Sequence, residues 1–209
     1  MSEIIELLKQ KHSTPTELVS MTIRVPAELA AQIDGLADYL EISRNETVLK
    51  LITPELKKVE NEIENLKTEE DEDIEDEIVG SGKNKFYLLN TNKAHYVSDH
   101  NRMVANGIAE AYSNPWKHYI DKIKEGDIVF LYENGRGIVA YGEGSGETKT
   151  GHRNNDPSQD ECHYQKLRNY TVLKTPIKAS EIRKLLGKKI PFLRTMIPLK
   201  DGKKILDRK

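Results

Sequence analysis

The stretch Leu18–Ile52, LVSMTIRVPAELAAQIDGLADYLEISRNETVLKLI, sets the architecture of the N-terminal part of this 209-residue chain. In residues 19–25 apolar and polar side chains alternate, and this period of two predicts a short strand with one apolar face. Pro26 ends the strand and suits the start of a helix, whose apolar residues recur at helical spacing up to Leu40. Ser43, with Glu46 three positions later, forms a capping-box pattern that predicts a second helix.

A lone strand of this length cannot satisfy its own backbone hydrogen bonds. The nearest available partner is the same strand of a second copy of the chain. The sequence therefore predicts a homodimer, formed through residues 18–66.

The motifs T-I-R-V-P-x-E-L and S-R-N-E in this stretch resemble the ribbon-helix-helix family of repressors and antitoxins. The resemblance implies that paired strands enter the major groove and face the base edges with Ser20, Thr22 and Arg24. It also implies a backbone-phosphate contact by the amides at the start of the second helix, near Ser43, Arg44 and Asn45.

A solvated two-stranded ribbon without DNA contact would show the same alternation, so that interpretation stays open. Residues 1–57 carry six Lys/Arg against nine Asp/Glu, a net charge of −3. Because nonspecific affinity for DNA comes from neutralising phosphates, we expect binding by this part alone to be modest and salt-sensitive.

Charge is strongly polarised along a chain whose overall charge is only −2. Residues 58–82 hold two Lys against eleven acids, a net of −9, whereas residues 162–209 hold fourteen Lys/Arg against three acids, a net of +11. The acidic run at 69–77 is expected to be a solvated spacer or, alternatively, a competitor of DNA for the basic surface.

Three segments follow from this pattern: a ribbon-helix-helix domain at 1–57, a linker at 58–82 and a second domain at 83–209. Pro54 predicts a break in the second helix. After it, apolar residues at heptad spacing predict a short coiled coil in the linker, formed by Leu56, Val59, Ile63 and Leu66.

The second domain shows strand and hairpin signals with helices between them. Buried-strand patterns occupy 86–90 and 127–132, the latter returning as a hairpin through 137–141, and a third strand is expected at 170–173. The polar stretch 142–159 predicts a mobile loop, and 179–186 predicts a helix. The whole chain is expected to be α+β, with a small β-barrel and inserted helices in its second half.

The segments FYLLNTN, NPWKHYI, KEGDIVFLY, GIVAYG and IPFLRTM resemble the PUA-like superfamily, in particular its EVE and YTH-related branch. The resemblance implies a pocket that accepts a single, often modified, nucleobase. For this pocket we expect walls from Trp116 and Tyr132, edge contacts from Asn90 and Asn92, and a rim of C-terminal Lys/Arg. Core packing of the two aromatic rings and turn formation by the two Asn remain the alternatives.

Other site chemistries have weaker support in the sequence. The histidines and the single Cys162 lack metal-ligand spacing, so we expect no metal site and no cofactor. A D…E-x-K order, formed by Asp127, Glu147 and Lys149, leaves a metal-dependent nuclease as a minor alternative.

The absence of long apolar runs predicts no contact with a membrane, and one cysteine fits a reducing, cytoplasmic location near the nucleoid. We therefore expect a non-enzymatic, homodimeric protein that binds duplex DNA, acts in transcription regulation and reads a modified base. An antitoxin-like autoregulator whose C-terminal domain binds a protein partner is the alternative.

Overall fold

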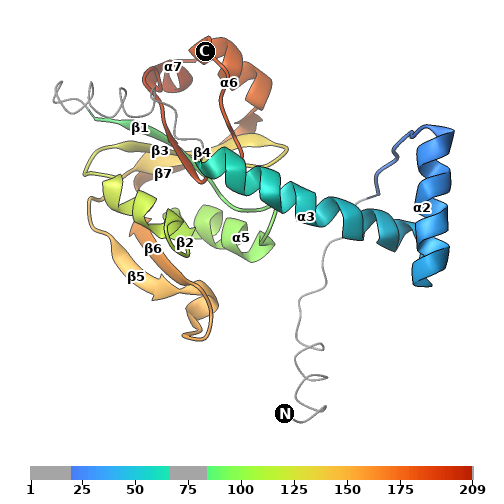
Figure 1. The fold of residues 1–209 in the computed structure, drawn as a ribbon. Coiled ribbons are helices and arrows are strands. Elements are labelled where there is room, and N and C mark those ends of the chain that lie inside the picture. The colour runs from blue at the N-terminus through green and yellow to red at the C-terminus, as the bar shows by residue number, and fades with distance from the viewer. Residues whose placement is uncertain (1–19, 66–83, 209) are drawn as a thin grey trace. The chain divides into compact units, whose positions relative to one another are not determined.

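A computed structural model describes residues 20–65 and 84–208, which divide into two compact units at Pro54/Glu55. Predictions that concern residues 1–19, 66–83 and 209 lie outside the described residues; they include Val19 of the ribbon, Leu66 of the heptad pattern and the acidic run. Figure 1 shows the order of the helices and strands.

The first unit is built on helix α2 (Ala27–Leu40) and the first part of helix α3 (Arg44–Asn65). Glu41, in the left-handed conformation, ends α2, and Ser43 begins α3 by accepting a 3.1 Å hydrogen bond from the Glu46 N–H. Both predicted helix starts are thus confirmed. Residues 20–25 form no helix or strand, so the predicted strand is not seen here and its pairing in a dimer stays a prediction.

The predicted break at Pro54 is wrong, because α3 continues through it. A proline removes only one helical hydrogen bond, the one to the carbonyl of Lys50, and Lys50 is exposed to water. One residue earlier, the Thr53 hydroxyl donates a 2.7 Å hydrogen bond to the Leu49 carbonyl.

The second unit contains two β-sheets with helices inserted between their strands (Figure 1). The five-stranded sheet has the order β7-β4-β3-β1-β8, formed by Arg168–Ile177, Gly137–Glu143, Ile128–Glu133, Phe86–Asn90 and Met196–Pro198. The three-stranded sheet has the order β2-β6-β5, formed by Ile108–Tyr112, Glu161–Lys166 and Lys149–His152. The α+β prediction is confirmed, while the expected single barrel is divided into these two sheets.

The remaining elements of this unit connect the strands. They are α5 (Val97–Asn106), the 3₁₀ helices η1 (Trp116–Lys122) and η2 (Arg153–Asn155), α6 (Ala179–Leu186) and α7 (Lys203–Leu206). The prediction of helix 179–186 is confirmed with the same bounds. The expected mobile loop at 142–159 is wrong, because it contains β5 and η2, and β5 pairs with β6.

Strand β1 is an interior strand of the five-stranded sheet, because it pairs parallel with β3 and antiparallel with β8. Both faces of this sheet are covered, one by a core that includes Leu89, Val129 and Leu131, the other by a core that includes Leu88 and Phe130. Such two-sided burial fixes the sheet rigidly. Its strand ends therefore provide a firm base for the loops that follow β1 and β3.

None of the helices in the described ranges is both long and apolar enough to cross a lipid bilayer.

Candidate functional site

A cavity of about 330 Å³ opens in the second unit, within the size range of small-ligand sites. Its walls come from the loop after β1, from the β2–η1 segment, from η2 and from residues just before β8. The C-terminal part of α3 closes one side with Lys57, Glu60, Asn61 and Glu64. Segments far apart in the sequence thus converge on one hollow.

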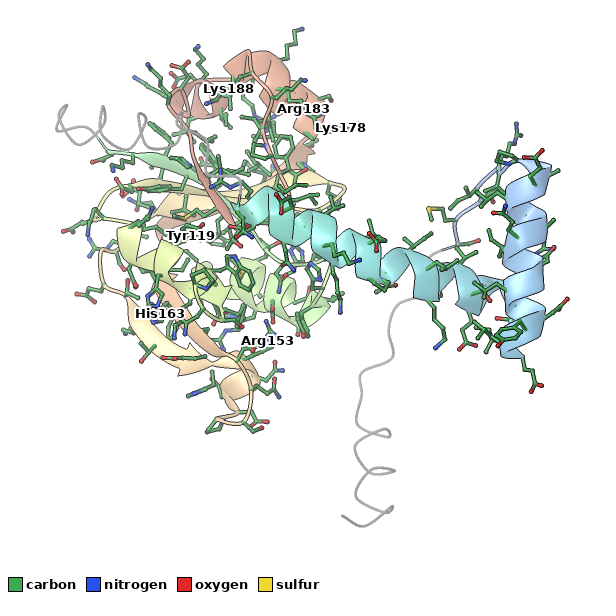
Figure 2. All side chains as sticks on the ribbon, viewed as in Figure 1. Tyr119, Arg153, His163, Lys178, Arg183 and Lys188 are labelled. Atoms are coloured by element: carbon green, nitrogen blue, oxygen red, sulfur yellow. The ribbon has the colours of Figure 1, made fainter. Side chains whose placement is uncertain are left out.

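Arg153 is the central charged group of this cavity. Its guanidinium carbon lies 3.7 Å from the ring centroid of Tyr96 and 4.3 Å from that of Tyr112. Its Nη1 donates a 2.8 Å hydrogen bond to Asp160, and its Nη2 lies 3.4 Å from Asp99. Since Arg153 is almost fully buried, these contacts hold it in one position (Figure 2).

Five buried side-chain atoms from residues that line the cavity lack a partner at ordinary hydrogen-bond geometry in the described part of the chain. They are Glu64 Oε1, Glu110 Oε1, Tyr112 OH, Asn134 Oδ1 and Arg153 Nε. Burying polar groups without partners costs free energy, so native structures rarely tolerate several together. A polar ligand or ordered water is the partner that such a site lacks.

The protonation of the cavity groups follows from their surroundings. Burial raises the pKa of Tyr112 above its ordinary value, and the charges of Glu110 and Asp99 raise it further, so the phenol remains a donor at neutral pH. Burial also raises the pKa of Asp99, opposed by a hydrogen bond from Asn92 and by the charge of Arg153.

Glu64 reaches the cavity from α3. Its Oε2 accepts hydrogen bonds from the Thr195 N–H at 2.6 Å and from the Thr195 hydroxyl at 3.2 Å. Burial raises the pKa of this carboxyl group, although the bonds from Thr195 and the charge of Arg194 oppose the rise. A partly desolvated carboxylate therefore forms one wall of the site.

Three of the four predicted pocket residues line the cavity: Asn90, Asn92 and Trp116. The Asn90 amide donates to the Phe192 carbonyl and accepts from the Asn92 N–H, both at 3.0 Å. The Asn92 amide donates to Asp99 at 2.8 Å, and Asn92 has a left-handed φ of 62°. Both amides thus also shape the turn after β1. Half-buried Trp116 presents its ring to the cavity at the start of η1.

The assignment of Tyr132 to a pocket wall is wrong. Its ring is 5% exposed and stacks on Phe192, with centroids 4.7 Å apart and planes 11° apart. Tyr132 shares a sheet face with Phe130, which packs into the same core cluster. Because that face is covered, the ring of Tyr132 is not exposed at the end of β3.

The predicted basic rim lies elsewhere. Figure 2 shows Lys178, Arg183 and Lys188 beside α6, away from Arg153, and none of the three lines the cavity. Lys178 and Arg183 are exposed. The C-terminal basic charge therefore forms a surface around α6 that is separate from the cavity.

The predicted DNA-contact residues of the first unit are all exposed in the single chain: Ser20, Thr22, Arg24, Ser43, Arg44 and Asn45. The side chain of Arg44 forms an ion pair with Asp34, which links α3 to α2. The Ser43 hydroxyl accepts from the Glu46 N–H. The Glu46 amide is therefore occupied, whereas the amides of Arg44 and Asn45 have no acceptor inside the helix.

Asp127 of the nuclease pattern has a structural role. It is buried, and its two carboxylate oxygens accept hydrogen bonds from the N–H groups of Lys85 at 2.7 Å and Lys124 at 2.8 Å. These bonds fix the turn that leads into β3.

Four groups at the centre of the cavity were not predicted from the sequence: Tyr96, Glu110, Tyr112 and Arg153. Arg153 lies in the stretch predicted to be a loop, and the two tyrosines belong to no recognisable motif. The signal available was the density of aromatic and amide residues between positions 90 and 116.

Comparisons with known proteins place the fold beside two solved structures. Over its C-terminal part, 58% of the chain, this protein is similar to protein PSPTO5229 from Pseudomonas syringae, with 97% of that chain covered, 12% identity and a TM-score of 0.40. The same share is similar to Rpa0253 from Rhodopseudomonas palustris, with 89% of that chain covered, 19% identity and a TM-score of 0.37. The names of these proteins state no function.

No protein-family model matches the chain, and no curated protein matches it.

Proposed function

We propose that this protein is a homodimeric nucleic-acid-binding protein whose second unit holds a single nucleobase in the cavity around Arg153. The observation that carries the proposal is the combination of aromatic rings with buried polar atoms that lack partners. A flat heterocycle needs a stacking surface for its face and hydrogen-bond partners for its edge, and this cavity offers both.

The polar groups favour a base that carries an amino group. Glu110 Oε1 and Asn134 Oδ1 are acceptors, whereas thymine and uracil present no exocyclic amine to them. Carboxylates accept hydrogen bonds from the amino group of cytosine. Cytosine, adenine or guanine is therefore the expected base, and the sequence resemblance to the PUA-like superfamily favours a modified form.

The first unit supplies the dimer and the contact with duplex DNA in this proposal. In the single chain, large apolar side chains of this unit are exposed to water: Met21 is 76%, Ile23 55% and Leu49 56% exposed. Apolar exposure of this extent marks an interaction surface. Pairing of two ribbons would cover the apolar side chains at 21, 23 and 25 and turn Thr22 and Arg24 toward DNA.

The exposed basic side chains near α6 supply a further electrostatic contact with the phosphate backbone. Two such surfaces and two cavities in a dimer would raise the apparent affinity through effective concentration.

Trp116 provides a direct test, because it is the only tryptophan of the chain and lines the cavity. Its emission should change saturably when the full-length protein is titrated with an oligonucleotide that carries the preferred base. A matched oligonucleotide with thymine at that position should change it far less. An unchanged emission spectrum with every oligonucleotide, together with intact binding, would place the base elsewhere.

The alternative is a C-terminal domain that binds a protein partner. Only a lack of nucleic-acid binding in the same titrations would support it.

A further inference from the structure

On the three-stranded sheet side of the second unit, two imidazole rings converge on one carboxylate. His118 and Asp121 come from η1, and His163 comes from β6, which the sequence places more than forty positions later. The Nδ1 atom of His118 lies 3.0 Å from Asp121 Oδ2, and the Nδ1 atom of His163 lies 2.8 Å from Asp121 Oδ1. One ligand atom from each residue lies within 4.8 Å of the other two.

The hydrogen bonds of His118 identify which ring nitrogen is available. Its Nε2 lies 3.0 Å from the Asn114 side-chain oxygen, an acceptor that requires the N–H to be on Nε2. A neutral His118 then directs the lone pair of Nδ1 toward the Asp121 carboxylate. A proton or a metal ion must therefore lie between this nitrogen and the carboxylate oxygen.

We propose that His118, Asp121 and His163 form a binding site for a divalent transition-metal ion, with Zn²⁺ as the best-suited ion. Two imidazole nitrogens and one carboxylate oxygen are ligands that Zn²⁺ prefers. With bonds of about 2.0–2.1 Å, tetrahedral ligands stand about 3.3 Å apart, close to the nitrogen–oxygen distances of 2.8–3.1 Å between the histidines and Asp121. The three ligand atoms lie within 4.8 Å of one another, so the exposed side chain of His118 must move inward when the ion binds. Water would complete the coordination.

The surroundings fit a metal site. The Asn114 oxygen orients His118 in the manner of the second-layer acceptors that fix metal-binding histidines. The side chains of His118 and Asp121 are 56% and 40% exposed, which leaves a path for the ion, while that of His163 is 12% exposed and fixed by its strand. The two imidazole rings meet edge to face, with centroids 4.9 Å apart.

Such an ion would join η1 to β6. The two elements are already connected by the ion pair of Lys117 with Glu161. Because η1 begins at Trp116, a bound metal would stabilise the segment that carries this wall of the cavity. This role is structural, and it stands whether or not the cavity binds a base.

The experiment is a Zn²⁺ titration of tag-free, full-length protein in competition with a chromogenic chelator, repeated with Co²⁺ to read the coordination from its visible spectrum. The test variants are His118→Ala and His163→Ala. His152→Ala is the matched control, since His152 lies at the end of β5 and is not one of the three cluster residues. Circular dichroism checks the fold of each variant.

The expected result is one high-affinity Zn²⁺ per chain for the wild type and for His152→Ala, with an increase in thermal stability on binding. Loss of one direct ligand should weaken binding by more than about 100-fold, beyond the usual effect of second-layer changes. Equal Zn²⁺ affinity in the cluster variants and the wild type would overturn the proposal, as would a wild type that takes up no Zn²⁺. If His163→Ala fails to fold, the His118→Ala variant still tests the proposal, because the side chain of His118 is exposed.

Discussion

The carboxylate of Glu64 accepts a 2.6 Å hydrogen bond from the backbone N–H of Thr195, a residue 131 positions later in the sequence. This bond fixes the end of α3 beside β8 and brings a buried carboxylate to the cavity wall.

The Glu64 contact makes the stability of the protein depend on pH. Burial raises the pKa of Glu64 above its ordinary value of 4.5, so the folded protein binds this proton more tightly than the unfolded chain does. The contribution is present at low pH and is lost as the pH rises from about 4.5 through the raised pKa. We expect Glu64→Gln to gain stability over the wild type as the pH rises from 4.5 to 7, measured by urea unfolding. A difference that is constant with pH would contradict this cause.

Replacement of Arg153 tests the aromatic cage. Arg153→Lys keeps the charge but loses the flat group between Tyr96 and Tyr112, so we expect a destabilisation of about 0.5–2 kcal/mol and weaker base binding. Arg136→Lys is the matched control, because the exposed Arg136 pairs only with Glu133 in the described contacts. Equal unfolding midpoints for the two variants would show that the cage contributes nothing.

His100 should cause a loss of stability in mild acid. Burial lowers its pKa below the ordinary value of 6.5, although the charge of Glu133 opposes this, and the ring lies 2.8 Å from the Thr91 hydroxyl. Because the unfolded chain binds the proton more tightly, the stabilising contribution is present above pH 6.5 and is lost as the pH falls below it. We expect the wild type to lose stability between pH 8 and 5 more steeply than His100→Asn. Parallel pH profiles of the two proteins would refute this.

Arg24 is the side chain expected to read duplex DNA. Arg24→Ala should weaken specific binding by about 1–3 kcal/mol, measured by fluorescence anisotropy on the preferred duplex. The control is Lys50→Ala, which removes an exposed positive charge from α3. If both variants lose the same affinity, Arg24 contributes to DNA binding only through its charge and does not read the base sequence.

Patterns that depend on burial were predictable from the sequence. The apolar runs at β1 and β3, the hairpin through Gly135 and the bounds of α6 all follow from hydrophobic periodicity and turn residues. Strand β5, with the sequence KTGH, is partly exposed at a sheet edge and has no apolar face, so its segment resembles a loop.

The cavity was only partly predictable, for a related reason. Asn90, Asn92 and Trp116 lie next to strand or helix ends that the pattern located. Tyr132 was misplaced because both faces of β3 are covered, a tertiary property that strand periodicity does not contain. Arg153 reaches the cavity because β5 pairs with β6. The local sequence does not predict this pairing.

The most direct test of the account is fluorescence anisotropy of the full-length protein with matched duplexes that differ at one base: cytosine, 5-methylcytosine, 5-hydroxymethylcytosine, thymine, adenine or N6-methyladenine. The wild type should prefer one amino-bearing base by more than about tenfold, or 1.4 kcal/mol. Trp116→Ala should lose that preference and keep its salt-dependent affinity for the duplex. Equal affinity for every duplex in the wild type, unchanged in Trp116→Ala, would contradict the proposal that the cavity reads a base.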